Sequence, residues 1–431
     1  MIEILSYCPG KPLAKLDAIL SRPTDFTPEL EASVRKIVAD VRKRGDDALL
    51  AYTRKFDGVA LTAGHLRVSE SDIEAASRNI NAGLLEAIQA SVDNIRRFHN
   101  AQKRTSWFME DGDGVILGKR YLPLERVALL IPGASAPLFS TLLMAAIPAQ
   151  IAGVPHLCMA TPPQPDGTVH PVVLAAAHLV GVKEIYRVFG AQAVAALAYG
   201  TASIPRADKL VGPGHPSVQI AKKMVFGAVD IDMVAGPSEI VVIADADANP
   251  RFVAADLLSQ AEHGSGFEAA VCVTPSKELA ERVADEVERQ AAGLARRDAV
   301  EKALRHFGAV VIVKDLAEGI DLANRIAPEH VELIVADPWA HLDGIRNAGA
   351  VFLGPAASES VGDYYAGTNH ILPTAGAARF ASSVGVDTFL KHISLVSYTE
   401  RRLRETADHI IQLAEAEGLD AHANAIRVRQ E

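Results

Sequence analysis

The stretch "EIVVIADADANPRFVAADLLSQAEHG", Glu239 to Gly264, contains the unit from which the fold can be predicted. The run "EIVVIADA" is short and almost entirely apolar, which is typical of a strand buried on both faces of a sheet. Asn249 can cap a helix that has Pro250 at its first position, and Gly264 can end that helix. The stretch therefore predicts one strand followed by one helix, the repeating unit of an α/β fold.

The same alternation occurs in two series along the chain. From about Val127, the short apolar runs "VALLI", "HLCMAT", "EIYRVFG" and "KLV" alternate with helical segments. The second series begins with "EIVVIADA" and continues with "AAVCVTP", "GAVVIV", "VELIVAD" and "GAVFLG". Alternating strands and helices favour parallel sheets that are covered by helices on both faces. We expect an α/β protein with two Rossmann-like parallel-sheet domains.

The remaining segments set the predicted domain boundaries. The first hundred or so residues carry apolar residues at helical spacing, and "SYTERRLRETADHIIQLAEAEG" near the C-terminus predicts a long amphipathic helix. We expect residues 1–126 and 239–381 to form a first α/β domain with N-terminal helices. Residues 127–238 are expected to form the second Rossmann-like domain, on the nucleotide side, and residues 382–431 a small helical tail.

The composition argues against several classes of function. The formal net charge is −10 and only 5% of residues are aromatic, with no long basic run, so nucleic-acid binding is not indicated. The cysteines Cys8, Cys158 and Cys272 are far apart and form no CxxC pair, which is typical of reduced thiols. Neither a signal peptide nor a membrane helix is predicted. We expect a cytoplasmic protein that acts on a small molecule.

Gln260 and His263 are placed one turn apart at the end of the predicted helix, so both side chains face the same side. They could bind a metal, contact a substrate or only cap their own helix. Zn²⁺ accepts imidazole nitrogen and carboxylate oxygen as ligands, which makes Asp363 and His422 reasonable companions. Because the four residues lie on three separate segments, their spacing leaves these alternatives open.

Glu329 and His330 stand side by side in "RIAPEHVEL", after Pro328 and directly before a predicted strand. A proline disfavours helix at the residue before it, which places the pair on a constrained turn. A carboxylate beside an imidazole can supply two proton-transfer groups of different pKa, as acid–base catalysis requires. The alternative is a Glu–His pair at the surface end of a strand.

Three further polar segments are candidates for a site. "ESVGDYYAGTNHILPT" follows a predicted strand and is long and interrupted by glycines, which is typical of a site loop; Asp363 could instead hold the loop by an Asx-turn. "PGASAP" (132–137) and "GPGHPS" (212–217) are turns between a strand and a helix, where backbone amides attract anions. Because ligands usually bind at the carboxyl ends of parallel strands, we expect the site there.

Five motifs in this order, "AGPSEIVVIAD", "DLLSQAEHG", "APEHVEL", "GDYYAGTNHILPT" and "AEGLDAHANA", resemble histidinol dehydrogenases. The resemblance extends over nearly the whole chain, from "RKRGDDALLAYTRKFDG" to the tail. It implies an NAD-dependent homodimer with one zinc ion per subunit that oxidises L-histidinol to L-histidine in two hydride transfers. It also implies a swapped tail, which would bring Glu417 and His422 into the site of the partner subunit.

Carried over motif by motif, the resemblance implies a role for each candidate residue. The implied metal ligands are Gln260, His263, Asp363 and His422, and the implied catalytic residues are Glu329 and His330. The implied substrate contacts are Ser238, Gln260, His263, His330, Asp363, Glu417 and His422.

The implied cofactor contacts are Leu130, Gln192 and His215. The family usually has Tyr where Leu130 stands, "GGAQ" where Phe189 begins "FGAQ", and Asn where His215 stands. These departures predict that NAD binds more weakly or in a differently shaped site than is typical.

Other readings remain open at the level of the sequence. A related zinc- and NAD-dependent dehydrogenase could oxidise another small amino or polar alcohol. A zinc hydrolase could use Glu329 to activate water, and a metal-binding protein could hold zinc without turnover. The sequence does not decide between zinc and manganese.

Overall fold

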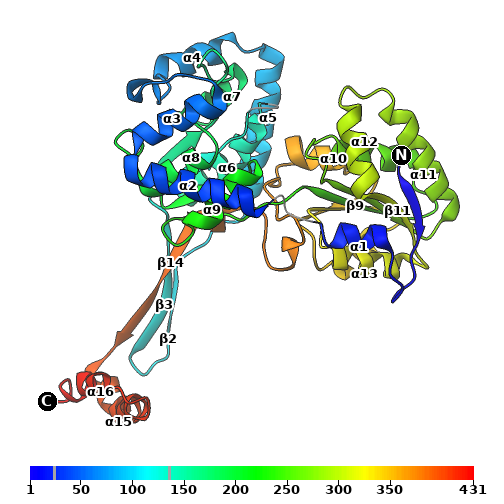
Figure 1. Ribbon diagram of the computed structural model, residues 1–431. Coiled ribbons are helices and arrows are strands. Elements are labelled where there is room, and N and C mark those ends of the chain that lie inside the picture. Colours follow the sequence, from blue (N-terminus) through cyan, green and yellow to red (C-terminus); the bar gives the residue numbers. More distant parts are fainter. Residues whose placement is uncertain (23–25, 134–136) are drawn as a thin grey trace.

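The chain forms two parallel sheets, each covered by helices, and a long antiparallel arm (Figure 1). The structure is a computed structural model that describes residues 1–22, 26–133 and 137–431. The expected α/β class with two parallel sheets is confirmed.

The larger sheet contains six parallel strands. Their order is β1 (Glu3–Ser6), β11 (Gly308–Ile312), β10 (Ala269–Thr274), β9 (Glu239–Ala244), β12 (His330–Ile334) and β13 (Ala350–Leu353). Every residue of β9, β10 and β12 is buried, which explains the continuous apolar runs in the sequence. β9 lies between β10 and β12, and His330 on β12 is in register with Ile240 on β9.

Helices cover both faces of this sheet. One face carries α10 (Pro250–Ala261), α11 (Lys277–Ala291) and α12 (Arg297–Phe307), and the other carries α1 (Ala14–Leu20) and α13 (Leu316–Ile326). The Asn249 side chain accepts a hydrogen bond from the Arg251 amide at 3.0 Å, and Pro250 is the first residue of α10. The start of this helix is therefore as the sequence predicts.

The smaller sheet contains five parallel strands. Their order is β6 (Glu184–Tyr186), β5 (His156–Ala160), β4 (Arg126–Leu130), β7 (Lys209–Val211) and β8 (Asp230–Ile231). One face packs against α4 (Glu70–Asn79), α5 (Ala82–Asn100), α6 (Phe139–Ala152) and α7 (Pro171–Leu179). The other packs against α2 (Pro28–Arg44), α3 (Asp46–Asp57), α8 (Ala191–Tyr199) and α9 (Pro216–Val225).

The N-terminal helices belong with the smaller sheet, and their expected grouping with residues 239–381 is wrong. Val34, Val41 and Leu49 share a core with Leu130, and Ile88 and Val92 share one with Leu129. Among the described elements of the N-terminal region, β1 and α1 pack on the larger sheet. The 3.6-residue periodicity predicted these helices correctly but does not state which sheet their apolar faces cover.

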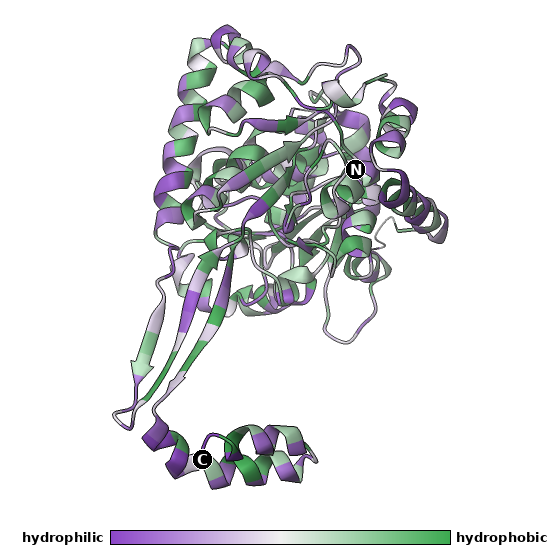
Figure 2. Ribbon diagram, turned by 90° about the vertical axis from the view of Figure 1, so that its left-hand side faces the viewer, coloured by the Kyte–Doolittle hydropathy of each residue, from purple (hydrophilic) through white to green (hydrophobic). Residues whose placement is uncertain are grey.

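The arm was not expected from the sequence. β3 (Val115–Pro123) pairs antiparallel with β2 (Trp107–Glu110) and with β14 (Leu390–Tyr398). The C-terminal segment is therefore not purely helical, although α15 (Glu400–Ala416) and α16 (Asp420–Arg427) follow the strand. Figure 1 shows these two helices at the far end of the arm, and Figure 2 shows apolar residues along its strands. Phe108 and Val396 are 73% and 71% exposed, so the arm presents a large apolar surface.

The connection from β8 to β9 sets how the two sheets face each other. β8 ends at Ile231 and β9 begins at Glu239, so the chain leaves the carboxyl edge of the smaller sheet and enters the amino edge of the larger one. Lys222 on α9 holds the start of this connection, because its ammonium group lies 2.5 Å from the buried Asp232 carboxylate. The Asp232 carboxylate also accepts the Gly212 amide at 2.7 Å.

Short helical turns complete the chain: η1 (Ala63–His65), η2 (Trp339–Gly344), α14 (Glu359–Val361), η3 (Gly362–Ala366), η4 (Ala377–Arg379) and η5 (Val386–Phe389). Within the residues that the structure describes, none of the helices is long and apolar enough to cross a membrane.

Candidate active site

A cavity of about 220 Å³ lies where the carboxyl edge of the smaller sheet meets the amino edge of the larger one. Glu329 and His330 at the start of β12 line it, together with Ser238, which directly precedes β9. For the larger sheet, the expectation that the site lies at the carboxyl ends of the strands is therefore wrong. The crossing from β8 to β9 brings the opposite edge to the cavity.

The end of α10 presents His263 to the cavity. The His263 Nδ1 atom lies 3.0 Å from the Gln260 carbonyl oxygen, the nearer of its two Gln260 contacts; because a carbonyl oxygen can only accept, this contact favours a proton on Nδ1 and a lone pair on Nε2. A histidine that donates one ring nitrogen to a carbonyl and presents the other is the usual arrangement of a metal ligand. The Gln260 side chain is fully buried beside it, with its amide nitrogen 3.3 Å from Nδ1.

His330 is held in one orientation by two carbonyl oxygens. Its Nδ1 atom lies 3.2 Å from the Glu239 backbone oxygen and 3.1 Å from the Gln260 side-chain oxygen. Both oxygens accept, so the proton is on Nδ1. The Nε2 atom is buried and has no hydrogen-bond partner among the described residues. His330 therefore offers an unpaired basic nitrogen in the cavity.

Burial keeps this imidazole neutral. Burial, followed by the nearby His263 and His370 rings, lowers the pKa of His330 to about 3. Burial likewise lowers the pKa of His370 to about 4. The neutral form of His330 is the one that can accept a proton.

Glu329 is bound to the neighbouring strand by a reciprocal pair of hydrogen bonds. Its amide donates to the Glu239 carboxylate at 3.1 Å, and the Glu239 amide donates to the Glu329 carboxylate at 3.3 Å. Burial raises the pKa of Glu329 well above its usual value, while the Ser238 hydroxyl and the Arg22 guanidinium act in the opposite direction. A carboxyl group with a raised pKa can take up and release a proton near neutral pH.

Asp363 enters the cavity from the loop after β13. It lies in η3, and its backbone oxygen accepts from His370 Nδ1 at 3.1 Å. Burial raises the pKa of the Asp363 carboxyl to about 6, and the His263 ring opposes this rise. The glycine-interrupted loop is therefore part of the cavity wall, as the sequence indicates.

The predicted ligands from the tail do not meet the others within one chain. Glu417 and His422 are exposed and lie at the end of the arm (Figure 1), whereas His263 and Asp363 line the cavity and Gln260 is buried in contact with His263 and His330. Across the described residues, no group of three or more His, Cys, Asp or Glu side chains could hold a metal ion. The cavity therefore contains part of the predicted metal-binding set.

A second cavity of about 730 Å³ adjoins the first and shares His263, Ala235 and Gly236 with it. His215 and Phe189 line this cavity, together with Pro132 and Gly133. Residues 134–136 of the "PGASAP" turn lie outside the described residues. The size and position of the second cavity suit a nucleotide whose reactive end reaches the first.

Two of the predicted cofactor residues do not line either cavity. The Leu130 side chain is fully buried in the core on central strand β4, between the faces covered by helices, so it offers no surface to a nucleotide. Gln192, 2% exposed, lies in the first turn of α8. A side-chain contact from Leu130 is therefore ruled out in this arrangement, whereas His215 is accessible.

Sequence analysis missed Ser140, Thr141 and Asp232, which line the first cavity, and gave no individual role to Tyr364, His370 and Thr374 of the candidate loop, which also line it. Ser140 and Thr141 stand in the first turn of α6, directly after the "PGASAP" turn. That turn was itself named as a candidate part of the site, so the sequence did indicate this region. Asp232 could not be found, because its place depends on the packing of the two sheets.

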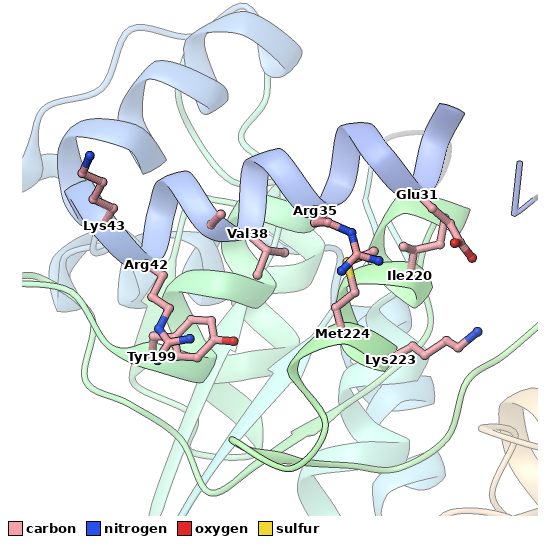
Figure 3. A pocket seen from close by; sticks show the side chains of 10 residues that line it. Glu31, Arg35, Val38, Arg42, Lys43, Tyr199, Ile220, Lys223 and Met224 are labelled. Atoms are coloured by element: carbon pink, nitrogen blue, oxygen red, sulfur yellow. The ribbon is translucent and has the colours of Figure 1, made fainter. Parts of the chain in front are cut away.

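An open groove of about 740 Å³ lies elsewhere, between α2 and α9 (Figure 3). Arg35, Arg42, Lys43 and Lys223 line it. Its described lining residues include one acid, Glu31, and no histidine, so it lacks the paired proton-transfer groups of the first cavity. The chemistry therefore points to the cavity between the sheets.

Comparison with known proteins identifies the family. The family model "Histidinol dehydrogenase" matches residues 20–430. The chain is 50% identical to the histidinol dehydrogenase of Synechococcus sp., covering 100% of this chain and 99% of the relative, and 48% identical to that of Heliobacterium mobile, covering 100% of both. The chain belongs to the histidinol dehydrogenase family.

The fold agrees with this assignment. The crystal structure of histidinol dehydrogenase from Elizabethkingia anophelis superposes with a TM-score of 0.93 at 39% identity, covering 100% of this chain and 98% of that one. Membership makes the chain an oxidoreductase of the dehydrogenase type. The expected resemblance is confirmed.

The effect of burial on the pKa of the acids behind this site can be tested at Glu332. Burial, followed by the nearby Asp256 carboxyl, raises its pKa to about 10 from the usual 4.5. The folded protein therefore keeps the proton that the unfolded chain releases, so this group lowers stability as the pH rises above about 4.5. Replacing Glu332 by Gln removes the penalty and keeps an oxygen to accept the Glu359 amide, which lies 2.8 Å away.

We expect Glu332→Gln to be more stable than the parent at pH 8, by up to about 1.4 kcal/mol for each pH unit above 4.5. Urea unfolding at pH 5, 6.5 and 8 measures the difference. The exposed Glu278→Gln on α11 is the control and should give a constant offset. A Glu332→Gln protein that is less stable than the parent at pH 8 would contradict the raised pKa of Glu332.

Proposed function

We propose that this protein oxidises L-histidinol to L-histidine through the aldehyde, with NAD as the hydride acceptor and zinc as the resident metal. One observation carries the proposal: in a member of this family, the unpaired, buried Nε2 atom of His330 lies in a small cavity beside Glu329. Converting a primary alcohol to an acid removes four electrons. NAD would therefore accept one hydride in each of two successive steps, using two molecules for each alcohol.

His330 supplies the base for the first oxidation. Its Nε2 atom removes the hydroxyl proton of the alcohol, because Nδ1 is already protonated and held by two carbonyl oxygens. The resulting imidazolium must release its proton to solvent before the second oxidation. The lowered pKa of His330 favours that release.

Glu329 acts as the base in the hydration of the aldehyde. Its carboxylate removes a proton from a water molecule as that water adds to the aldehyde carbon. His330 then accepts the hydroxyl proton of the hydrate during the second oxidation. Ser238, beside Glu329, holds the carboxylate in place for this step.

The residues at the cavity fit a zinc ion. His263 and Asp363 line the cavity and would supply an imidazole nitrogen and a carboxylate, and Gln260, buried in contact with His263 and His330, would supply an amide oxygen. When bound, the ion would hold the substrate's imidazole and amine in place, orienting the hydroxyl toward His330. The fourth ligand would be His422 of a second subunit.

We propose that the arm and tail form a swapped homodimer. The exposed apolar residues along β2, β3 and β14 support this, because a monomer seldom leaves so much apolar surface in water. The exposure of Glu417 and His422 supports it further, since neither side chain forms a hydrogen bond or an ion pair with another described residue of its own chain. In the dimer these two residues would complete the partner subunit's site.

A related alcohol is the alternative substrate. The altered nucleotide contact at His215 would suit a diverged enzyme, although the cavity of about 220 Å³ and its polar lining fit a small amino alcohol in either case. Competition between L-histidinol and other amino alcohols distinguishes the two.

The function is tested by counting NADH per alcohol consumed by the zinc-loaded protein. We expect two for the parent and for the control Glu278→Gln. Glu329→Gln should release aldehyde and approach one, because hydration of the aldehyde slows by roughly 10²-fold or more without its base. No NADH from the parent would contradict the proposal, and a Glu329→Gln enzyme that still gives two would contradict the role of Glu329.

The shared site is tested by mixing two inactive variants. Glu417→Ala and His330→Ala chains, refolded together, should regain part of the parent activity, since mixed dimers contain one site with both residues intact. Each variant refolded alone is the control and should stay inactive. Failure to regain activity, with mixed dimers shown by mass spectrometry of differently tagged chains, would contradict the swapped arrangement.

A further inference from the structure

Arg22 lies directly behind the catalytic pair, although it is far from it in sequence. It follows α1, and its guanidinium forms an ion pair with the Glu239 carboxylate. The Arg22 and Glu239 side chains are only 4% and 2% exposed. An isolated buried charge is very unfavourable, so each of these groups depends on the other.

Glu239 connects this cation to both proposed catalytic residues. Its carboxylate accepts the Glu329 amide at 3.1 Å, its amide donates to the Glu329 carboxylate at 3.3 Å, and its backbone oxygen lies 3.2 Å from His330 Nδ1. A movement of Glu239 would therefore displace the Glu329 carboxylate and rotate the His330 ring together.

We propose that Arg22 is a positioning residue of this dehydrogenase, which fixes Glu239 and through it the Glu329 carboxylate and the His330 ring. This inference rests on the proposed function. Arg22 does not line the cavity and would touch neither substrate nor cofactor. Its guanidinium also balances the negative charge of two carboxylates that share a pair of hydrogen bonds.

Electrostatics reinforce the geometry. The titratable and charged groups that face the Glu329 carboxyl are Arg22 after α1, Glu239 on β9, His330 on β12, Glu359 on α14 and Asp363 in η3. His330 is neutral, so Arg22 is the cation in this set. Arg22 lowers the pKa of Glu329, in opposition to burial and to Asp363. Without it, the pKa of Glu329 would rise further and the carboxyl would be less often ionised and able to act as a base.

Arg22→Met removes the charge and keeps most of the buried stem. We expect kcat at pH 7 to fall by at least tenfold while KM for the alcohol stays within about threefold. The acid limb of the kcat profile should move up by about one pH unit or more, the effect of an opposite charge on a carboxyl nearby. Arg22→Lys keeps the positive charge but lacks the planar guanidinium group. It should therefore shift the acid limb of the kcat profile less than Arg22→Met does, while still lowering kcat.

Arg126→Met is the matched control. Arg126 forms a partly buried ion pair with Glu184 at 2.8 Å in the smaller sheet, away from the cavity. Its loss should lower stability and leave the pH profile of kcat unchanged. If Arg22→Met keeps the parent's kcat and pH profile, the inference is wrong while the proposed function stands.

A measurement without substrate separates the two proposals. In Arg22→Met, one of the two buried carboxyls keeps a proton in the folded state that the unfolded chain releases above about pH 4.5. The stability deficit against the parent should therefore grow in urea unfolding as the pH rises through the range in which the parent's Glu329 loses its proton, which its raised pKa places above 4.5. Should the parent fail to oxidise histidinol, a deficit that does not change with pH would still overturn the inference, and a growing one would support it. If Arg22→Met does not fold, Arg22→Lys is measured in its place.

Discussion

The reciprocal hydrogen bonds between Glu239 and Glu329 are the interaction on which the site depends. Each residue stands at the amino end of a central strand, and each gives its amide to the carboxylate of the other. The bonds hold the starts of β9 and β12 together at the edge that faces the smaller sheet. His330 follows at once, and its ring is oriented by the same Glu239. Two neighbouring strand ends thus fix a base and a carboxyl within one small cavity.

This arrangement buries several acids at and behind the cavity. Burial raises the pKa of Glu329 and Glu359 well above the usual value. The Glu239 amide and the Arg22 guanidinium oppose this rise at Glu329, and the Ser259 hydroxyl opposes it at Glu359. Such a site is specific because its charges have fixed places before any substrate enters. The same site is sensitive to changes in distant residues, because one lost partner leaves another charge unpaired.

The local features of the fold could be predicted from the sequence, and the long-range ones could not. The α10 helix with its Asn249 cap follows from neighbouring residues, and so do the buried strands and the Glu329–His330 turn. Which edge of the larger sheet lines the cavity depends on how the chain crosses from β8 to β9, and the residues of either strand do not indicate this. Arg22 meets Glu239 across 217 residues, and no periodicity indicates such a contact.

The arm could be predicted from the sequence only in part. The segment "MEDGDGV" between β2 and β3 contains Asp–Gly pairs, a common signal of a hairpin turn, so this pairing could have been found. The pairing of β14 with β3 spans most of the chain and could not. Among the motif residues, those on the two sheets converge at the cavity, while Glu417 and His422 lie at the end of the arm, and their proposed role depends on a second chain.

The most direct measurement is a crystal structure of the zinc-loaded protein with L-histidinol bound. The account predicts a hydroxyl oxygen within hydrogen-bond distance of His330 Nε2, an imidazole and amine held on the side of Gln260, His263 and Asp363, and Glu329 next to the alcohol carbon. A substrate bound with its hydroxyl turned away from His330, or in the groove between α2 and α9, would contradict it.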